Sequence, residues 1–158
     1  MIKLLITGGT IDKVYDELTG ELVFKKTHIV DMLNRGHSMS ETVSEVLFLK
    51  DSLEITKADR QLILSKCLGS KEDKILITHG TDTMVETAQL LGKEVKGKTI
   101  VLFGAMVPYS INNSDALFNL GFALSSVQTL EKGIYVAMNG RFFNFDKVAK
   151  NKIMGIFE

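Results

Sequence analysis

The chain has 158 residues, which is enough for one domain with a substantial hydrophobic core. Its 19 basic and 19 acidic side chains cancel, which argues against an extended phosphate backbone as ligand and therefore against nucleic-acid binding. Cys67 is the only cysteine, so an internal disulfide is excluded and a reducing compartment fits. No apolar run is long enough for a signal sequence or a membrane span, and we expect a globular, cytoplasmic protein without a membrane partner.

Short apolar runs alternate along the chain with segments of helical periodicity. In chain order the pattern predicts a strand at 3–7, a helix at 27–35, a strand at 43–49, a helix at 56–68, a strand at 74–78, a helix at 83–93, a strand at 99–104, a helix at 114–130 and a strand at 133–138. This alternation predicts an α/β fold, with an open, mostly parallel sheet of about five strands and helices on both faces. Right-handed crossovers are expected to connect the strands.

Threonines mark the predicted helix starts. Thr27 is expected to cap the first helix, and Thr56 is followed three residues later by Asp59, which resembles a capping box. Thr83 and Glu86 have the full capping-box spacing, so we expect Thr83 to cap its helix.

Two segments carry no clear helix or strand pattern. Residues 12–22 are polar and contain Gly20, so we expect a loop there. From Asn139 onward the periodicity is weak and the sequence assigns no element, and the lysine cluster at 147–152 is expected to form a solvated face. No repeat or linker interrupts the chain, which we expect to be a single domain over 1–158 with no second domain.

Two predicted strands end in a threonine beside glycine. The first loop reads Thr7-Gly8-Gly9-Thr10, and its glycines permit positive φ and let backbone N–H groups face a ligand. The second loop reads Thr78-His79-Gly80-Thr81-Asp82, and its last two side chains are free if the next residue caps the helix. Parallel strands place their carboxyl ends at one edge of the sheet, where open α/β sheets bind ligands. Two hydroxyls and a carboxylate are therefore expected to converge on one small ligand, as nucleophilic hydrolysis requires.

Each of these motifs alone has a structural interpretation, because glycine and threonine are common in turns and caps. Only the pair, each at a strand end, favours a site. We expect Thr7 and Thr78 to be strand residues, and His79 to be a packing or hydrogen-bonding residue rather than a base. The histidines are scattered and no cysteine pair supports them, so no metal site is expected. The glycine loops match neither G-x-x-x-x-G-K-[ST] nor G-x-G-x-x-G, so nucleotide binding lacks its usual signature.

Four segments occur in a fixed order: Thr7-Gly8-Gly9-Thr10-Ile11, His79-Gly80-Thr81-Asp82-Thr83-Met84, Gly104-Ala105-Met106-Val107-Pro108 and Ser114-Asp115-Ala116-Leu117-Phe118-Asn119-Leu120. Together they resemble the bacterial L-asparaginases that use a threonine nucleophile, and the similarity covers nearly the whole chain. The resemblance implies a three-layer, flavodoxin-like fold of the asparaginase amino-terminal-domain type. It also implies hydrolysis of L-asparagine to L-aspartate and ammonia without metal or organic cofactor, in a homo-oligomer (dimer or tetramer).

The resemblance further implies a role for each matching residue. Thr10 matches the nucleophile, and Tyr15 takes the part of the family's loop tyrosine, which helps to move a proton. Thr81 and Asp82 match the second-loop pair, with Asp82 placed to hold the substrate ammonium. The implied substrate-binding residues are Gly9, Asp51, Ser52, Gly80 and Ala105, of which Ser52 binds the α-carboxylate and Ala105 lines the pocket with its backbone.

Two departures from the family pattern leave alternatives open. The chain resembles only the amino-terminal domain of two-domain enzymes, in which a neighbouring subunit completes each site, so that wall is expected to be either missing or replaced, with another copy of this chain as the candidate replacement. The family's lysine that pairs with the second-loop threonine and aspartate is not found: counting back from 133–139 places Val127 there, and Lys13 and Lys152 are the candidate substitutes. An asparaginase-like amidohydrolase is the leading hypothesis. A non-catalytic amino-acid-binding or regulatory domain, or an amidase for another small amide such as glutamine, is the alternative.

Overall fold

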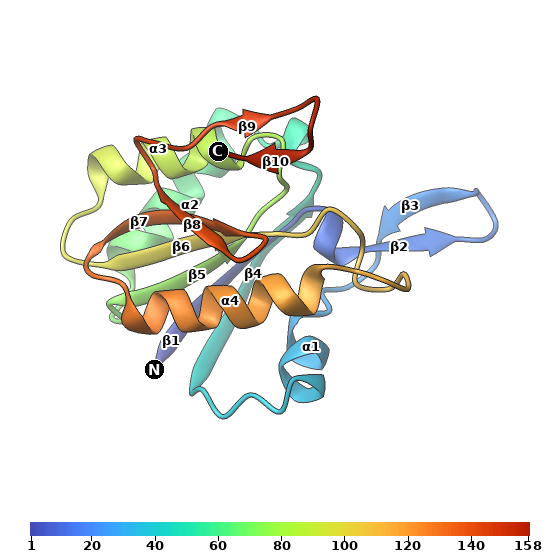
Figure 1. Ribbon diagram of the computed structural model, residues 1–158, viewed down its shortest axis with the longest axis horizontal. Coiled ribbons are helices and arrows are strands. Elements are labelled where there is room, and N and C mark those ends of the chain that lie inside the picture. The colour runs from blue at the N-terminus through green and yellow to red at the C-terminus, as the bar shows by residue number, and fades with distance from the viewer.

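The computed structural model describes residues 1–158 and shows a six-stranded sheet between two layers of helices (Figure 1). The strands lie in the order β4–β1–β5–β6–β7–β8, and all neighbours are parallel except β7 and β8. Their bounds are β1 Ile2–Gly8, β4 Thr42–Lys50, β5 Lys74–Thr78, β6 Thr99–Phe103, β7 Gly133–Met138 and β8 Arg141–Asn144. The predicted α/β fold is confirmed, with one strand more than the five expected.

Four α-helices cover the two faces of the sheet: α1 Ile29–Arg35, α2 Lys57–Gly69, α3 Met84–Glu94 and α4 Ala116–Thr129. Helices α1 and α4 pack on one face, and α2 and α3 on the other (Figure 1). Successive residues of β1 alternate between these layers, because Leu4 and Ile6 belong to the α1–α4 core and Leu5 to the α2–α3 core. A strand buried on both faces is apolar at every position, which explains the continuous apolar runs in the sequence.

The topology places both threonine loops at one point of the sheet. Numbered in chain order, the five parallel strands lie in the order 2-1-3-4-5, as in flavodoxin-like sheets. The strand order therefore reverses between β1 and β5, and such switch points are where open sheets bind ligands. The loops that carry Thr10 and Thr81 follow these two strands.

The predicted loop at 12–22 is wrong, because the chain there leaves a short helix and enters a hairpin. The 3-10 helix η1 spans Thr10–Asp12, and β2 (Lys13–Asp16) pairs antiparallel with β3 (Glu21–Phe24). Gly20 closes the turn with a φ of 73°. The hairpin projects from the body of the domain (Figure 1), and all its residues are exposed or half-buried. No buried apolar face therefore marks these strands in the sequence.

The segment from Asn139 onward forms three short strands. Asn139 and Gly140, with φ of 51° and 78°, make the two-residue turn between β7 and β8. Two consecutive positive φ angles are typical of the type I′ hairpin turn, which Asn-Gly favours. The strand β9 (Lys150–Asn151) then pairs antiparallel with β10 (Ile156–Phe157). Phe157 is buried in the α2–α3 core, which fixes this last hairpin against the domain.

The capping box predicted at α2 is confirmed, and the one predicted at α3 is wrong. Thr56 and Asp59 make both hydrogen bonds of the box. Thr83 instead donates its hydroxyl to Ser52 O (2.8 Å), and Glu86 pairs with an arginine of α2. Long-range partners have therefore replaced the local ones, and the Thr83 bond joins the second loop to the segment after β4.

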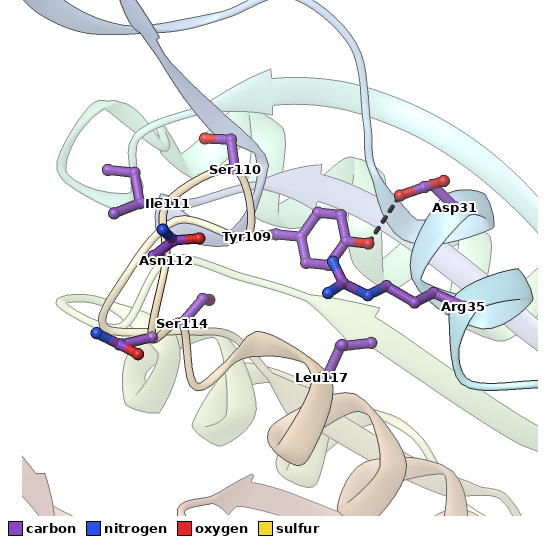
Figure 2. A pocket seen from close by; sticks show the side chains of 9 residues that line it. Asp31, Arg35, Tyr109, Ser110, Ile111, Asn112, Ser114 and Leu117 are labelled. Carbon is purple, nitrogen blue, oxygen red and sulfur yellow. Dashed lines mark hydrogen bonds between the residues drawn. The ribbon is translucent and has the colours of Figure 1, made fainter.

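The loop between β6 and α4 supports the first threonine loop from one side. Tyr109 N donates to Ile11 O (3.3 Å), and Ser110 Oγ donates to Lys13 O (2.9 Å). The Tyr109 hydroxyl donates to Asp31 of α1 (2.7 Å), and a cavity of about 360 Å³ lies between this loop and α1 (Figure 2). No residue of either threonine loop lines that cavity, so it is separate from the strand ends.

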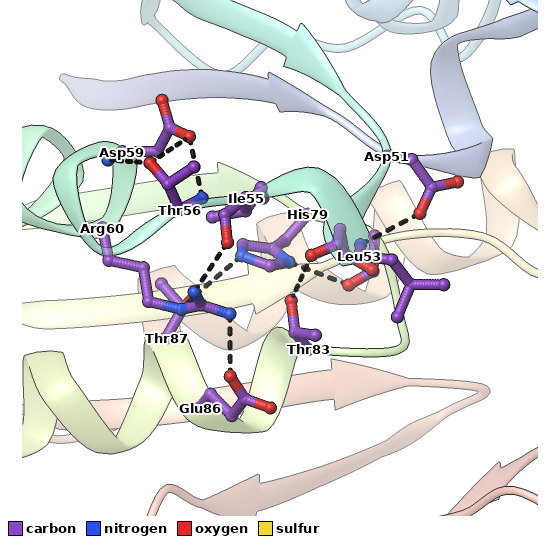
Figure 3. A network of polar contacts seen from close by, with 12 residues as sticks. Asp51, Leu53, Ile55, Thr56, Asp59, Arg60, His79, Thr83, Glu86 and Thr87 are labelled. Atoms are coloured by element: carbon purple, nitrogen blue, oxygen red, sulfur yellow. Dashed lines mark hydrogen bonds and ion pairs between the residues drawn. The ribbon is translucent and has the colours of Figure 1, made fainter.

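A chain of buried hydrogen bonds fixes the second threonine loop to α3 and α2 (Figure 3). His79 is fully buried and hydrogen-bonded, as predicted. Its Nδ1 donates to Gly80 O (2.8 Å), so its Nε2 accepts from Thr87 Oγ1 (2.8 Å). Arg60 Nε donates to the same hydroxyl (3.2 Å), and Arg60 Nη1 donates to Ile55 O (2.9 Å). Arg60 therefore ties the second loop to the segment after β4.

This environment keeps His79 neutral. Burial and the nearby Arg60 charge lower the pKa of His79 from 6.5 to about 4, against the opposing effect of the hydrogen bond to Gly80. An unfolded chain binds a proton here near pH 6.5, whereas the folded chain does not bind it until about pH 4. The contribution of the neutral His79 to the unfolding free energy is therefore fully present above pH 6.5 and is lost as the pH falls toward 4.

We predict that His79→Gln flattens the pH dependence of stability. Between pH 7 and pH 5, His79 should cost the wild type roughly 1–2 kcal/mol of unfolding free energy, because only the unfolded chain gains the proton. Glutamine retains a donor and an acceptor but does not titrate, so this part of the slope should disappear. Urea denaturation at several pH values measures it.

His37→Gln is the matched control, because His37 is exposed. It shows what replacing an exposed histidine with glutamine does by itself to the measured curve. Equal slopes for the wild type and His79→Gln would contradict the assignment of a neutral, buried imidazole.

Candidate active site

Three loops meet at the carboxyl edge of the sheet, and their backbones are almost in contact. Gly9 N donates to Lys50 O (2.9 Å), which joins the loops after β1 and β4. A Cβ atom on Gly9 would lie 2.5 Å from Gly80 N, and one on Gly80 would lie 2.6 Å from Ser52 Cβ. Gly9 also has a φ of 85°, which strains any other residue. Glycine at these two positions is what allows the three loops to share one site.

The predicted strand residues Thr7 and Thr78 lock the two strand ends together. Thr7 N donates to Thr78 Oγ1 (3.0 Å), and Thr7 Oγ1 donates to Thr78 O (2.5 Å). Both side chains are buried, so neither hydroxyl is available to a ligand. They are structural, as predicted.

The first loop holds Thr10 at the start of η1. Thr10 is half-buried, and its hydroxyl has no hydrogen-bond partner within the chain. Asp12, fully buried at the other end of η1, accepts from Thr27 Oγ1 (3.0 Å) and His28 N (2.8 Å) through one carboxylate oxygen. Burial raises the pKa of the Asp12 carboxyl. Thr27 Oγ1 also accepts from Ile29 N (3.3 Å), so Thr27 both anchors η1 and caps the first turn of α1 as predicted, one residue before the N-cap position His28.

Lys150 completes the second loop. Its Nζ donates to Thr81 Oγ1 (2.7 Å) and to Asp82 Oδ1 (2.6 Å). The Lys150 side chain is only 8% exposed, whereas that of Asp82 is 40% exposed, so the ammonium is buried and the carboxylate stays open to solvent. Because the ammonium donates to Thr81, the Thr81 hydroxyl proton is free to face a ligand or a water molecule.

The expectation that no lysine pairs with Thr81 and Asp82 is therefore wrong. Val127 is fully buried in the α1–α4 core, on the inner face of α4. Of the two suggested substitutes, Lys13 pairs with Asp51, and Lys152 is exposed. The paired lysine lies beyond β7 because the chain returns through β8 and β9 to the carboxyl edge. The Asn-Gly turn after β7 was the available signal for that return.

The loop after β4 supplies the predicted substrate-binding residues. Asp51 caps the 3-10 helix η2 (Ser52–Glu54) by accepting from Leu53 N (3.0 Å). Asp51 Oδ2 also lies 2.5 Å from Lys13 Nζ, which connects this loop to the first one. Ser52 is buried beside Gly80. The structure thus brings Gly9, Thr10, Asp51, Ser52, Gly80, Thr81 and Asp82 to one edge of the sheet.

Two predicted site residues stand apart from this cluster. Tyr15 lies on β2 and is 61% exposed, so it is not packed against either threonine loop. Ala105 follows β6 and its side chain is buried in the α1–α4 core, which leaves only its backbone to face a ligand.

The structure contains no group of three or more His, Cys, Asp or Glu side chains close enough to hold a metal ion. None of its helices has the length and apolarity that crossing a membrane requires.

Comparisons with known proteins agree with this geometry. Residues 1–155 match the family model described as "Asparaginase, N-terminal". The L-asparaginase of Thermococcus kodakarensis is 31% identical over 98% of this chain and 49% of its own length. Its solved structure superposes with a TM-score of 0.87, at 29% identity, over 99% of this chain and 50% of that one.

Two further proteins are similar to this chain. A glutamyl-tRNA(Gln) amidotransferase subunit of Methanococcus vannielii is 31% identical over 88% of this chain and 34% of its own length. The structure of a probable cytoplasmic L-asparaginase from Campylobacter jejuni gives a TM-score of 0.79 at 28% identity, over 94% of this chain and 47% of that one. The chain thus spans half or less of the length of these relatives. From the family model and these identities, we conclude that the chain belongs to the asparaginase family.

Proposed function

We propose that this chain is an amidohydrolase that converts L-asparagine to L-aspartate and ammonia and needs no cofactor. The observation that carries this proposal is the Lys150 ammonium bound to both Thr81 and Asp82, at the same sheet edge as Thr10. Lys150 is the amine partner of Thr81 and Asp82 that was not found in the sequence. Its supposed absence was the reason to consider a non-catalytic binding domain.

In the proposed reaction Thr10 Oγ attacks the side-chain amide carbon of asparagine. The backbone amides of Thr10 and Thr81 make no hydrogen bond within the chain, so they are the candidate donors to the oxyanion. Gly9 N is already bound to Lys50 O and is excluded from that role. The C–N bond then breaks, and the amide nitrogen takes up the proton lost by the Thr10 hydroxyl and leaves as ammonia. An aspartyl ester remains on Thr10.

The second loop serves the second half of the reaction. A water molecule held by the free Thr81 hydroxyl attacks the ester, and the neighbouring Lys150 and Asp82 charges stabilise the proton movements. Aspartate is released and Thr10 regains its proton. Asp82 Oδ2 is not used by Lys150 and is free to accept the substrate ammonium. Tyr15 would join the first half as a proton carrier when its hairpin closes.

A related small amide, with glutamine as first candidate, is the second proposal. It is supported by the relative named as an amidotransferase subunit for glutamyl-tRNA(Gln). The ratio of kcat/KM for asparagine to that for glutamine decides between the two substrates.

We further propose that the chain acts in a cytoplasmic homo-oligomer. Large apolar side chains are exposed on loops at the ligand edge, among them Leu53, Met106 and Ile153. A second copy covering them would also close the open site. A fully active monomer in light scattering would rule this assembly out.

We predict that Thr10→Ala lowers ammonia release from L-asparagine by roughly 10³-fold or more, because the nucleophile is lost. An enzyme-coupled ammonia assay measures it. Thr19→Ala, which changes an exposed threonine in the turn of the β2–β3 hairpin, should retain wild-type activity. Unchanged activity in Thr10→Ala would remove the nucleophile assignment.

We predict that Lys150→Met lowers kcat by about 10²- to 10⁴-fold, because the water-activating group loses its charge partner. Lys152→Met is the matched control, two residues away and exposed, and should leave kcat unchanged. Equal rates for the two variants would show that the Lys150 contacts are structural. Melting temperatures of both proteins check that each remains folded.

A further inference from the structure

Lys13 connects the nucleophile loop to the loop after β4. Its Nζ lies 2.5 Å from Asp51 Oδ2, and the Phe24 ring lies 5.6 Å away on the same hairpin. The Lys13 side chain is 18% exposed and that of Asp51 is 32% exposed. The pair is therefore reachable from solvent, unlike the more deeply buried Lys150.

Lys13 also lies on the same side of η1 as Thr10. It is the C-cap residue of this 3-10 helix, and its backbone N–H donates to Thr10 O. With three residues per turn, side chains at positions i and i+3 lie one above the other. The partner carboxylate, Asp51, directly precedes Ser52, which is buried beside Gly80. The Lys13 ammonium thus lies between the loops of Thr10 and Ser52.

The charges at this edge match those of an amino-acid headgroup. Two ammonium groups, Lys13 and Lys150, pair with two carboxylates, Asp51 and Asp82. Lys150 uses two of its three N–H donors on Thr81 and Asp82, whereas Lys13 uses one on Asp51, so Lys13 has more donors left for an incoming carboxylate. A partly exposed ion pair adds little to stability, so its geometry can change on binding at small cost.

We propose that Lys13 is a specificity-determining residue that binds the α-carboxylate of the substrate beside Ser52. Asp51 is its positioning residue and holds the ammonium between the two loops in the free protein. The ligand class is a small amide with a free carboxylate next to its ammonium. This proposal rests on the amidohydrolase function and adds the group that recognises one end of the substrate.

The test compares two amides in one variant. L-Asparagine carries the α-carboxylate, whereas β-alaninamide keeps the amine and the amide and lacks the carboxylate. Lys13→Met should raise KM for asparagine about 10- to 100-fold, as expected for losing a hydrogen bond to a charged group. Its kcat/KM for β-alaninamide should stay within about twofold of wild type, because the missing charge has no partner there. If turnover of β-alaninamide is too slow, its inhibition constant against asparagine hydrolysis replaces kcat/KM.

The ratio of the two values does not depend on how much of the variant is folded, since both come from one preparation. Lys25→Met, which changes the exposed lysine that directly follows β3, should leave the ratio at its wild-type value. Equal losses on both substrates, or none, would overturn the proposal and leave Lys13 a structural link. A wild type that binds but does not hydrolyse asparagine would refute the amidohydrolase function instead, and calorimetry with Lys13→Met would still test the carboxylate contact.

Discussion

The site depends on a steric constraint: loops from β1, β4 and β5 approach so closely that only glycine fits at two of their contacts. Gly9 lies against Gly80, and Gly80 lies against Ser52. The constraint arises from the parallel sheet, which brings three carboxyl ends to one edge, and from the switch in strand order between β1 and β5. A substitution at Gly80 would move Ser52 and Thr81 together, because both loops would have to separate.

Lysine–aspartate ion pairs then place charged groups at two of these loops. Lys150 donates hydrogen bonds to Thr81 and Asp82, and Lys13 pairs with Asp51 beside Ser52. These two lysines come from opposite ends of the chain, on the β2–β3 hairpin and on the β9–β10 hairpin. Both hairpins are therefore parts of the site, although neither belongs to the central sheet. The hydrogen bonds that link His79, Thr87 and Arg60 hold the second loop against α2 and α3. They add no charge that titrates near neutral pH, because His79 is neutral there.

The sequence predicted the parts of this molecule in which burial dictates residue type. Four of the five parallel strands, including Lys74–Thr78 and Gly133–Met138, are largely continuous apolar runs because both of their faces are covered, whereas the edge strand β4 has no buried residue. The β2–β3 hairpin was missed because it is exposed and shows no apolar alternation. The capping box at Thr83 was wrong because Ser52 and Arg60, distant in sequence, offer better partners.

The lysine of the second loop was missed for a different reason. Its position depends on how the chain returns after β7, through the Asn139-Gly140 turn and two short hairpins, and no local pattern at Lys150 indicates that path. Motif resemblance identified the threonine loops because their glycines and threonines are adjacent in sequence. It could not place a lysine that lies 69 residues away from Thr81 in the sequence.

The central claim is that Thr10 forms the covalent bond and that Thr81 with Lys150 resolves it. The most direct measurement is a rapid acid quench of Lys150→Met with L-asparagine, followed by peptide mass spectrometry. The account predicts an aspartyl ester on the peptide that contains Thr10, at higher occupancy than in the wild type, because hydrolysis of the ester is slowed. An ester on the peptide of Thr81, or ammonia release by wild type and variant with no ester on either peptide, would contradict it.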